Sequence, residues 1–240
     1  MKIVALNLNH KASLRAIKPR LVEVVERLNP DVLTLNEYVH GESRTQLVEA
    51  LAHIGLGNLL CSERLNGNNQ VLIASRTPIF VGDLRGPDTA DQGGESNFLH
   101  VVEAQTGLEI VGVRAPAYEK AAELRDYWQK LAAIIRATSY RKIVFVGDLN
   151  ADPVGSRSAG ALQLAALRSE GWRIPAPIGA WSYVSGSHID HIVASETVAI
   201  EDARYVADIA GITIASQTKK TAISDHAALV VNLRTLKNAS

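Results

Sequence analysis

The stretch that decides the fold is Gly147-Asp148-Leu149-Asn150-Ala151-Asp152-Pro153, which follows directly on the apolar run Ile143-Val144-Phe145-Val146. A short apolar run that ends in turn residues is typical of a buried β-strand. The sheet holds carboxylates and amides at the end of such a strand in place, while the adjoining loop lets a substrate or a cation reach them. Taken alone, the stretch is also compatible with an ordinary Asx turn after a strand.

Four more polar islands border apolar runs in the same way. They are Asn7-Leu8-Asn9 after Ile3-Val4-Ala5-Leu6, Asn36-Glu37 after Val32-Leu33-Thr34-Leu35, His188-Ile189-Asp190-His191 before Ile192-Val193-Ala194-Ser195, and Ser224-Asp225-His226 before Ala227-Ala228-Leu229-Val230-Val231. Each island has a plain alternative, since asparagine is a common turn former and a loop glutamate is usually solvated. Because five occur in one chain, we expect a shared cleft that contains Glu37, Asp148, Asp190 and His226.

The composition predicts one α/β domain over residues 1–240. The chain is 47% hydrophobic and 21% charged, which suits a full core, and no linker or fixed-period repeat divides it. Lys+Arg and Asp+Glu both total 25, and this zero net charge weakens the case for broad electrostatic binding to a phosphate polymer. Local phosphate contacts stay open for the basic residues Arg15, Lys18, Arg20, Arg141, Lys142, Lys219 and Lys220.

Three features favour a cytoplasmic location. Cys61 is the only cysteine, so no disulfide can form within the chain, and a reducing compartment is favoured. The N-terminus reaches polar Asn7 too soon for the apolar region of a signal peptide. No apolar run approaches the roughly 18 residues that a membrane-spanning helix needs.

Apolar periodicity predicts four helices and a set of strands. Helical spacing runs through residues 17–28, 47–54, 121–135 and 162–171, and strand-like runs beyond those quoted cover 71–75, 181–184, 189–195 and 227–233. Residues 100–103 and 108–113 predict a hairpin around Gln105-Thr106-Gly107. This mixture favours a mixed sheet over a purely parallel one. Residues 82–97, rich in Gly and Asp, are the best candidate for a mobile surface loop.

In order and context, the five islands resemble the motifs of the endonuclease/exonuclease/phosphatase superfamily of the exonuclease III and DNase I type. The stretch 147–153 is similar to the family's GDxN signature, and Ile189-Asp190 with Ser224-Asp225-His226 is similar to its closing pair of motifs. The resemblance implies a four-layer α/β sandwich, in which two mixed β-sheets pack face to face with helices outside. It also implies hydrolysis of phosphoester bonds with Mg²⁺ or Mn²⁺ at one end of the sandwich.

The resemblance assigns the metal to a set of oxygen ligands. Glu37 is the leading ligand, because a carboxylate at a strand end offers the hard oxygen that Mg²⁺ prefers. Asn7 and Asn9 would add neutral oxygens, either directly or through water. Asp225 would hold a second metal ion or hydrogen-bond its own loop.

The resemblance also assigns the catalytic groups. Asp148 would activate the attacking water, with Asn150 orienting water or phosphate beside it. His226, when protonated, would offset the charge that builds on the phosphoryl oxygens. Asp190 would fix the tautomer of His226 and raise its pKa.

A zinc site in the run His188-Ile189-Asp190-His191 is the weaker interpretation. Imidazole and carboxylate are good zinc ligands. However, alternation along a strand puts His188 and Asp190 on one face and His191 on the opposite one, so a single ion cannot easily reach all three.

The sequence departs from the family's pattern at several positions, among them Ala117, where the nuclease branch often carries asparagine. Arg114 stands where the nuclease branch often carries tyrosine; its guanidinium is a candidate phosphate clamp and transition-state stabiliser, with a structural salt bridge as the alternative. Tyr118 is a candidate source of the missing hydroxyl. His10 stands where relatives often have glycine, and Ser185-Gly186-Ser187 where abasic-site nucleases commonly carry an aromatic residue. These departures disfavour abasic-site repair and leave the hydrolytic centre untouched.

The favoured function is a Mg²⁺- or Mn²⁺-dependent phosphodiesterase, a nuclease acting on DNA or RNA. The alternative is a phosphoesterase for a small or lipid-linked substrate, such as a phosphorylated sugar, nucleotide or sphingolipid. A binding protein without catalysis is disfavoured, because the polar set around Glu37, Asp148 and His226 is intact. The expected partner is therefore nucleic acid or a small phosphoester.

Overall fold

Two mixed β-sheets form the centre of the computed structural model, which describes residues 1–9, 18, 20–41, 43–154, 156–219 and 221–234. The first sheet has the order β10 (Ile200–Val206), β13 (Ala228–Leu233), β1 (Lys2–Asn7), β2 (Val32–Tyr38), β4 (Gln70–Ser75) and β3 (Asn58–Cys61). The second has the order β5 (Ile79–Val81), β6 (Phe98–Glu103), β7 (Glu109–Val113), β8 (Ile143–Asp148) and β9 (Asp190–Ala194). The neighbours β1 and β2, and β7 and β8, run parallel, and the other pairs run antiparallel.

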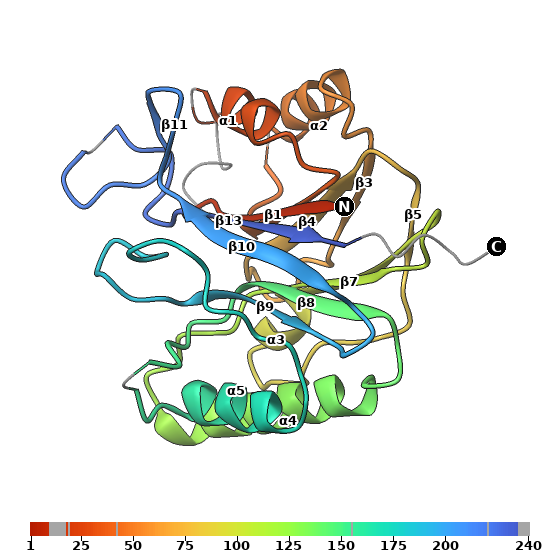
Figure 1. Cartoon of the computed structure of the whole chain (residues 1–240), viewed down its shortest axis with the longest axis vertical. Helices are drawn as coiled ribbons and strands as arrows, with labels where there is room; N and C mark the ends of the chain where they lie inside the picture. Colours follow the sequence, from red (N-terminus) through yellow and green to blue (C-terminus); the bar gives the residue numbers. More distant parts are fainter. Residues whose placement is uncertain (10–17, 19, 42, 155, 220, 235–240) are drawn as a thin grey trace.

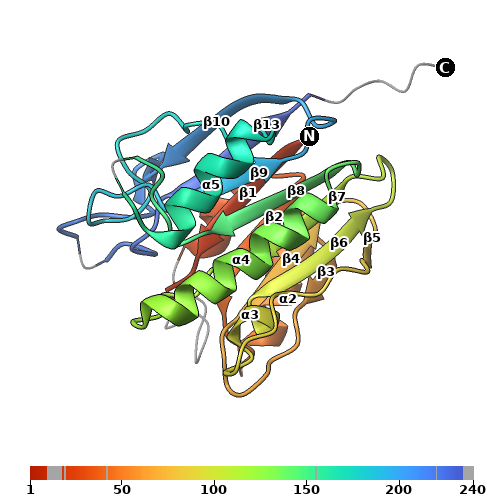
Figure 2. The same ribbon diagram turned by 90° about the horizontal axis from the view of Figure 1, so that it is seen from below.

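Helices cover the outer face of each sheet, which completes four layers (Figure 1). The pair α1 (Leu21–Leu28) and α2 (Arg44–His53) packs on the first sheet, and the pair α4 (Ala121–Ala137) and α5 (Ala159–Ser169) packs on the second. Figure 2 shows α4 and α5 lying side by side across their sheet. The four-layer α/β sandwich implied by the sequence is therefore confirmed.

The alternation of side chains along β1 explains its continuous apolar run. Ile3 and Ala5 face the core between the two sheets, whereas Val4 and Leu6 face the core beneath α1 and α2. A strand buried on both faces has no polar face to show in its sequence. The islands of polar residues therefore mark the places where such strands leave the core.

The predicted helices are present, although their boundaries differ by a few residues. Helix α1 buries Leu21, Val24, Val25 and Leu28 on one face and stops at Asn29, which adopts a left-handed conformation with φ 48° before Pro30. Helix α5 begins earlier than predicted, because the Ser158 hydroxyl accepts a hydrogen bond from the Ala161 N–H and caps the first turn. Among the described residues, no helix has both the length and the apolar character needed to cross a membrane.

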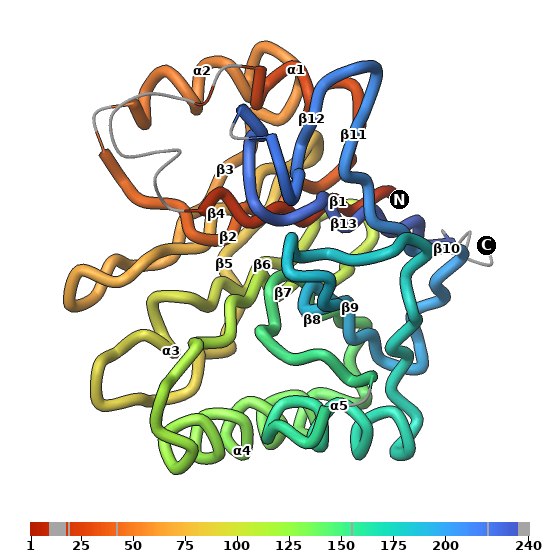
Figure 3. Tube along the Cα trace, turned by 90° about the vertical axis from the view of Figure 1, so that its left-hand side faces the viewer, coloured from red at the N-terminus to blue at the C-terminus, as the bar shows by residue number. Residues whose placement is uncertain are grey.

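One predicted strand is absent, and several of the observed strands were not predicted. Residues 181–184 do not form a strand; the Ser182 and Tyr183 N–H groups donate to the Ser187 carbonyl in a tight loop, and Tyr183 makes only an isolated bridge to His226. Strands β3, β5 and β10 and the small ribbon of β11 (Asp208–Ile209) and β12 (Ile212–Thr213) were not predicted. That ribbon lies beside α1 (Figure 3).

The segment 82–97, predicted to be a mobile surface loop, is partly built into the sandwich. It contains the short helix α3 (Gly93–Ser96), and Gly93, Gly94 and Ser96 are buried. The Ser96 hydroxyl donates to the Glu63 carbonyl at 2.9 Å and accepts from the Leu65 N–H at 2.7 Å. The segment is thereby tied to the connection between β3 and β4.

Glu103 stabilises the hairpin between β6 and β7, and its replacement gives a test of the fold. The buried carboxylate accepts hydrogen bonds from the Gln105 N–H at 2.9 Å and from the Thr106 N–H and hydroxyl at 2.8 and 2.6 Å. Glu103→Gln should lower the free energy of unfolding by about 1–3 kcal/mol, because an amide N–H group would face these donors. Urea unfolding at pH 7 measures this loss.

The loss should also depend on pH. Burial alone would raise the pKa of Glu103, but the hydrogen bonds from Thr106 and Thr77 and from the backbone outweigh it and hold the pKa below 4.5. The carboxylate therefore contributes stability above the unfolded pKa and loses it as the pH falls through the folded pKa. The difference between wild type and Glu103→Gln should shrink below about pH 4.5; a constant difference would contradict the assignment.

Candidate active site

A cavity of about 370 Å³ lies at the edge of the sandwich where β1, β2 and β8 end and where β9 begins. Parallel pairing sets Asn7 beside Asn36, and antiparallel pairing sets Asp148 beside Asp190. Strand ends from both sheets therefore meet at one place. The cavity is lined by Asn9, Glu37, Asn69, Arg114, Asp148, Asn150, Tyr183, Ile189, Asp225 and His226.

Asp190 and His226 form a buried hydrogen-bonded pair beside this cavity. Nδ1 of His226 lies 2.8 Å from Oδ2 of Asp190. Burial alone would lower the pKa of His226, but the charge and hydrogen bond of Asp190 and the charge of Asp148 outweigh it and raise the pKa to about 9. The imidazole is therefore a cation at neutral pH, with Nε2 as its remaining donor.

Asp148 is held by amides on two sides. Its Oδ2 accepts from Nδ2 of Asn7 at 3.0 Å and of Asn150 at 3.3 Å, and its Oδ1 accepts from the Asn150 N–H at 3.0 Å. Burial and the charge of Asp190 raise the pKa of Asp148 to about 7, although His226 and Arg114 oppose the shift. A carboxylate with such a pKa can exchange a proton near neutral pH.

A bulge in β2 aims Glu37. The register between β2 and β4 shifts between Leu35 and Tyr38, and Glu37 has a positive φ of 52°. A left-handed conformation costs a residue other than glycine about 1–2 kcal/mol. Bulges re-aim side chains near functional sites, and here the carboxylate enters the cavity. Asn9 and Asn150, which line the same cavity, also have positive φ.

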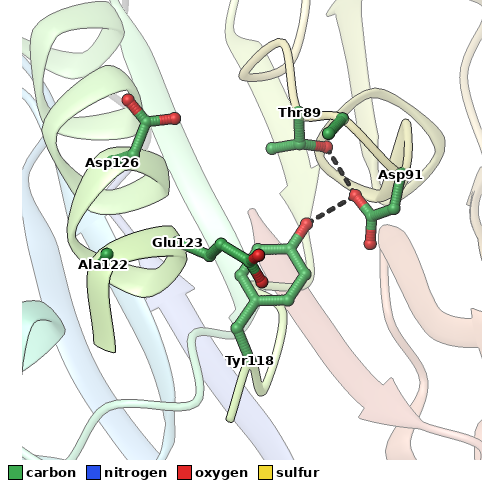
Figure 4. A pocket seen from close by; sticks show the side chains of 7 residues that line it. Thr89, Asp91, Tyr118, Ala122, Glu123 and Asp126 are labelled. Atoms are coloured by element: carbon green, nitrogen blue, oxygen red, sulfur yellow. Dashed lines mark hydrogen bonds between the residues drawn. The ribbon is translucent and has the colours of Figure 1, made fainter. Parts of the chain in front are cut away.

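Arg114, from the end of β7, points its guanidinium at these carboxylates. Nε donates to Oε1 of Glu37 at 2.8 Å and lies 4.0 Å from Oδ2 of Asp148. Both the salt-bridge and the phosphate-contact interpretations of Arg114 thus concern the same cleft. The hydroxyl of Tyr118, the other candidate for the missing tyrosine, donates instead to Oδ1 of Asp91 at 2.6 Å in a separate pocket (Figure 4).

The donor groups of the cavity suit a hard divalent cation. Glu37, Asp225 and Asn9 line it with carboxylate and amide oxygens, which Mg²⁺ and Mn²⁺ prefer, and the thiol of Cys61 is not among the lining groups. Asp148, Asp190 and His226 also place ligand atoms within 4.8 Å of one another. The Asp190–His226 hydrogen bond already uses Nδ1 of that histidine, so the oxygen set around Glu37 fits a metal ion better.

Asn7 lies behind Asp148 instead of lining the cavity. Its Nδ2 donates to Asp148, and its Oδ1 accepts from the Asn9 N–H at 2.8 Å. Both ends of the amide thus have partners within the protein. Direct metal binding by Asn7 stays a prediction, and its observed contact is with the carboxylate of Asp148.

Asn36 joins the two sheets directly beneath the cavity. Its Nδ2 donates to the Val113 carbonyl, and its Oδ1 accepts from the Asp148 N–H, both at 3.2 Å. Gly147 permits this approach, because a Cβ atom there would lie 2.2 Å from the Val113 oxygen and 2.5 Å from Oδ1 of Asn36. The sequence marked Asn36 only as a neighbour of Glu37.

Asn69 and Ser182 also belong to the site, and neither was predicted. Asn69 lines the cavity from the connection between β3 and β4, and nothing in the sequence signalled this because β3 itself was not recognised. The Ser182 hydroxyl accepts from the N–H groups of Ile189 and Asp190 at 2.8 and 3.1 Å and fixes the start of β9. The ring of Tyr183 packs against His226 with centroids 4.9 Å apart.

The neighbouring histidines do not form a zinc site with Asp190. Nε2 of His191 contacts the carbonyls of Ala151 and His188 at 2.9 and 2.8 Å, on the face away from His226. His188 lies with its ring 5.7 Å from that of Tyr205. Neither His188 nor His191 belongs to a group of described residues whose ligand atoms could hold a metal ion together; the alternation itself stays a prediction for His188, which precedes β9.

Of the basic residues singled out in the sequence, those that the structure describes do not line the cavity. Arg141 and Lys142 precede β8, whereas the cavity lies at the other end of that strand, about 20 Å away. Arg141 pairs with Asp83 and Glu109. Lys18, Arg20 and Lys219 bond to Ala222, Glu23 and Thr213, respectively. Arg15, Lys220 and His10 lie outside the described residues.

Comparison with known proteins agrees with this geometry. A family model described as "Endonuclease/Exonuclease/phosphatase family" matches residues 4–226. No relative was found among curated proteins.

Solved structures share the fold at low sequence identity. An AP endonuclease from Archaeoglobus fulgidus has a TM-score of 0.73 at 17% identity, covering 98% of this chain and 100% of that chain. A 3'-5' exonuclease (NExo) from Neisseria meningitidis has a TM-score of 0.70 at 20% identity, with the same coverage. A variant of the 3' phosphatase NExo from Neisseria, bound to product DNA hairpin, has a TM-score of 0.69 at 19% identity, also covering 98% and 100%.

Proposed function

Because the chain belongs to the endonuclease/exonuclease/phosphatase family, we propose that it is a Mg²⁺- or Mn²⁺-dependent phosphodiesterase that acts on DNA or RNA. One observation carries the proposal: the buried Asp190–His226 pair and Asp148 lie at the same cavity as Glu37. Protonated His226, the candidate general base Asp148 and the oxygen ligand Glu37 thus lie in one cleft. Together they provide the charge stabilisation, proton transfer and metal binding that phosphoester hydrolysis can use.

Asp148 is the proposed general base. Its carboxylate would accept a proton from the attacking water, and a pKa of about 7 suits that transfer near neutral pH. Asn7 and Asn150 hold the carboxylate through their amide N–H groups. Water oriented between Asp148 and the phosphorus would then attack in line with the leaving oxygen.

His226 and Arg114 are the proposed partners of the phosphoryl oxygens. Nε2 of His226 would donate to an oxygen whose negative charge grows in the transition state, while Asp190 keeps Nδ1 occupied. The Nη groups of Arg114 would contact the same phosphate. Glu37, Asn9 and Asp225 would hold the divalent cation, which supplies Lewis-acid stabilisation of the phosphoryl charge when bound.

Two observations favour different classes of substrate. The similar structures include an AP endonuclease and a variant of a 3' phosphatase bound to product DNA hairpin, which favours nucleic acid. The zero net charge of the chain and the distance of Arg141 and Lys142 from the cleft favour the alternative, a phosphoesterase for a small or lipid-linked substrate.

A metal-dependent screen tests the proposal. We expect hydrolysis of plasmid, single-stranded DNA or RNA in Mg²⁺ or Mn²⁺, none in EDTA, and recovery when the cation is restored. Glu37→Gln should need a higher cation concentration, because a neutral amide replaces a charged ligand. Activity that persists fully in EDTA would contradict the metal assignment. Turnover of a bis-aryl phosphodiester alone would favour the small-substrate alternative.

A further inference from the structure

Arg114 and Glu37 form an ion pair inside the cleft. Only 19% of the Arg114 side chain and 13% of the Glu37 side chain are exposed, and their contact runs from Nε to Oε1 at 2.8 Å. Within the described part of the chain, Nη1 and Nη2 of Arg114 make no hydrogen bond, and Arg114 lines the cavity. The guanidinium thus holds a carboxylate with one nitrogen and has two more for another anion.

The same carboxylate is the proposed ligand of the divalent cation. A guanidinium and a divalent cation on one carboxylate repel each other, and the repulsion is strong where water is partly excluded. A charge in such a place also needs a partner, because an uncompensated buried charge is costly. Arg114 can therefore leave Glu37 readily only if another anion takes the place of that carboxylate.

We propose that Arg114 exchanges Glu37 for the substrate phosphate, and that this exchange couples phosphate binding to metal binding. The inference rests on the proposed function. When phosphate occupies the cleft, the Nη groups pair with its oxygens, and Oε1 of Glu37 is no longer shared between Arg114 and the cation. Arg114 and Glu37 then each have an oppositely charged partner both without phosphate and with phosphate bound. A tyrosine at this position would lack the charge needed for such an exchange.

Coupling of this kind is reciprocal. If phosphate strengthens cation binding by some factor, the cation must strengthen phosphate binding by the same factor. The cleft would then bind the cation weakly alone and tightly together with substrate. Arg114 would act as the coupling residue in addition to its contact with the phosphate.

Titration with Mn²⁺, followed by the electron paramagnetic resonance of the free ion, tests the exchange without measuring turnover. Removing Arg114 ends its contact with Oε1 of Glu37 and its repulsion of the cation, so Arg114→Ala should bind Mn²⁺ about tenfold more tightly than wild type in the absence of phosphate. Inorganic phosphate should tighten Mn²⁺ binding about tenfold in wild type and much less in the variant. Arg114→Gln should behave like Arg114→Ala and guards against a folding defect, which thermal unfolding would reveal.

Arg136→Ala is the matched control. Arg136 makes a similar Nε contact, 2.7 Å from Oε2 of Glu170, between α4 and α5 and away from the cleft. Its loss should leave Mn²⁺ binding and the phosphate effect unchanged. Equal Mn²⁺ affinity and an equal phosphate effect in Arg114→Ala and wild type would overturn the exchange and leave the proposed hydrolase standing. Failure of the wild type to bind Mn²⁺ at all would overturn both.

Discussion

Asp148→Asn should lower kcat by at least about a hundredfold, the usual contribution of a positioned general base. Asparagine has nearly the same shape but cannot take a proton from water. KM should change far less, because His226 and Arg114 remain to hold the phosphate in the ground state. Steady-state kinetics on the substrate found in the screen measure both constants.

Thermal stability and a surface variant serve as controls for this prediction. Asp148 is a buried carboxylate whose burial raises its pKa, so a neutral residue there should leave the thermal stability unchanged or higher. Asp126→Asn, on the exposed surface of α4, removes a carboxylate from a surface ion pair with Lys130 and should leave kcat as it is. Near-normal turnover in Asp148→Asn would refute the mechanism.

His226→Ala should also lower kcat by about a hundredfold, the scale for losing one donor to a developing phosphoryl charge. Asp190→Asn should give a smaller loss, because the asparagine would still contact the ring without supplying its charge. Together the two positions act as one unit, since Nδ1 and Oδ2 are 2.8 Å apart. Kinetics of both single variants and the double variant measure this dependence.

The double variant is the sharper test. If Asp190 acts only through His226, then His226→Ala combined with Asp190→Asn should be no slower than His226→Ala alone. A double variant whose losses multiply would mean that Asp190 has a separate function, such as metal binding. Kinetics at pH values well below 9 keep the wild-type imidazole protonated during the comparison.

The place of the site was predictable because strands impose it. An apolar run buried on both faces must end where the core ends, so polar residues at the ends of β1, β2 and β8 had to lie at one edge once the sheets were packed. The four-layer α/β sandwich was predicted from the order of the motifs, through their resemblance to a known family. The pairing of Asp190 with His226 was predictable from the same motifs, because both residues belong to the closing pair.

Other features depend on geometry that the sequence does not encode locally. The bulge that aims Glu37 is a misregister between β2 and β4, which appears only when both strands are paired. The Tyr118 hydroxyl binds Asp91 instead of entering the cavity. Asp91 lies in the segment 82–97, which is held in place by hydrogen bonds to residues far away in the sequence. Strand β10 escaped notice because Glu201 and Asp202 interrupt its alternation of buried and exposed residues.

Because β13 comes last in the chain order of the strands, the active site can form only late in ribosomal synthesis. β13 inserts between β10 and β1, and its Val230 pairs with Val4 near the opposite end of the sequence. A growing chain folds its earlier segments first, yet β1 lacks this neighbour until β13 emerges. His226 reaches Asp190 in the same late step. A nascent chain can therefore hold most of its strands while its cleft still lacks the imidazole.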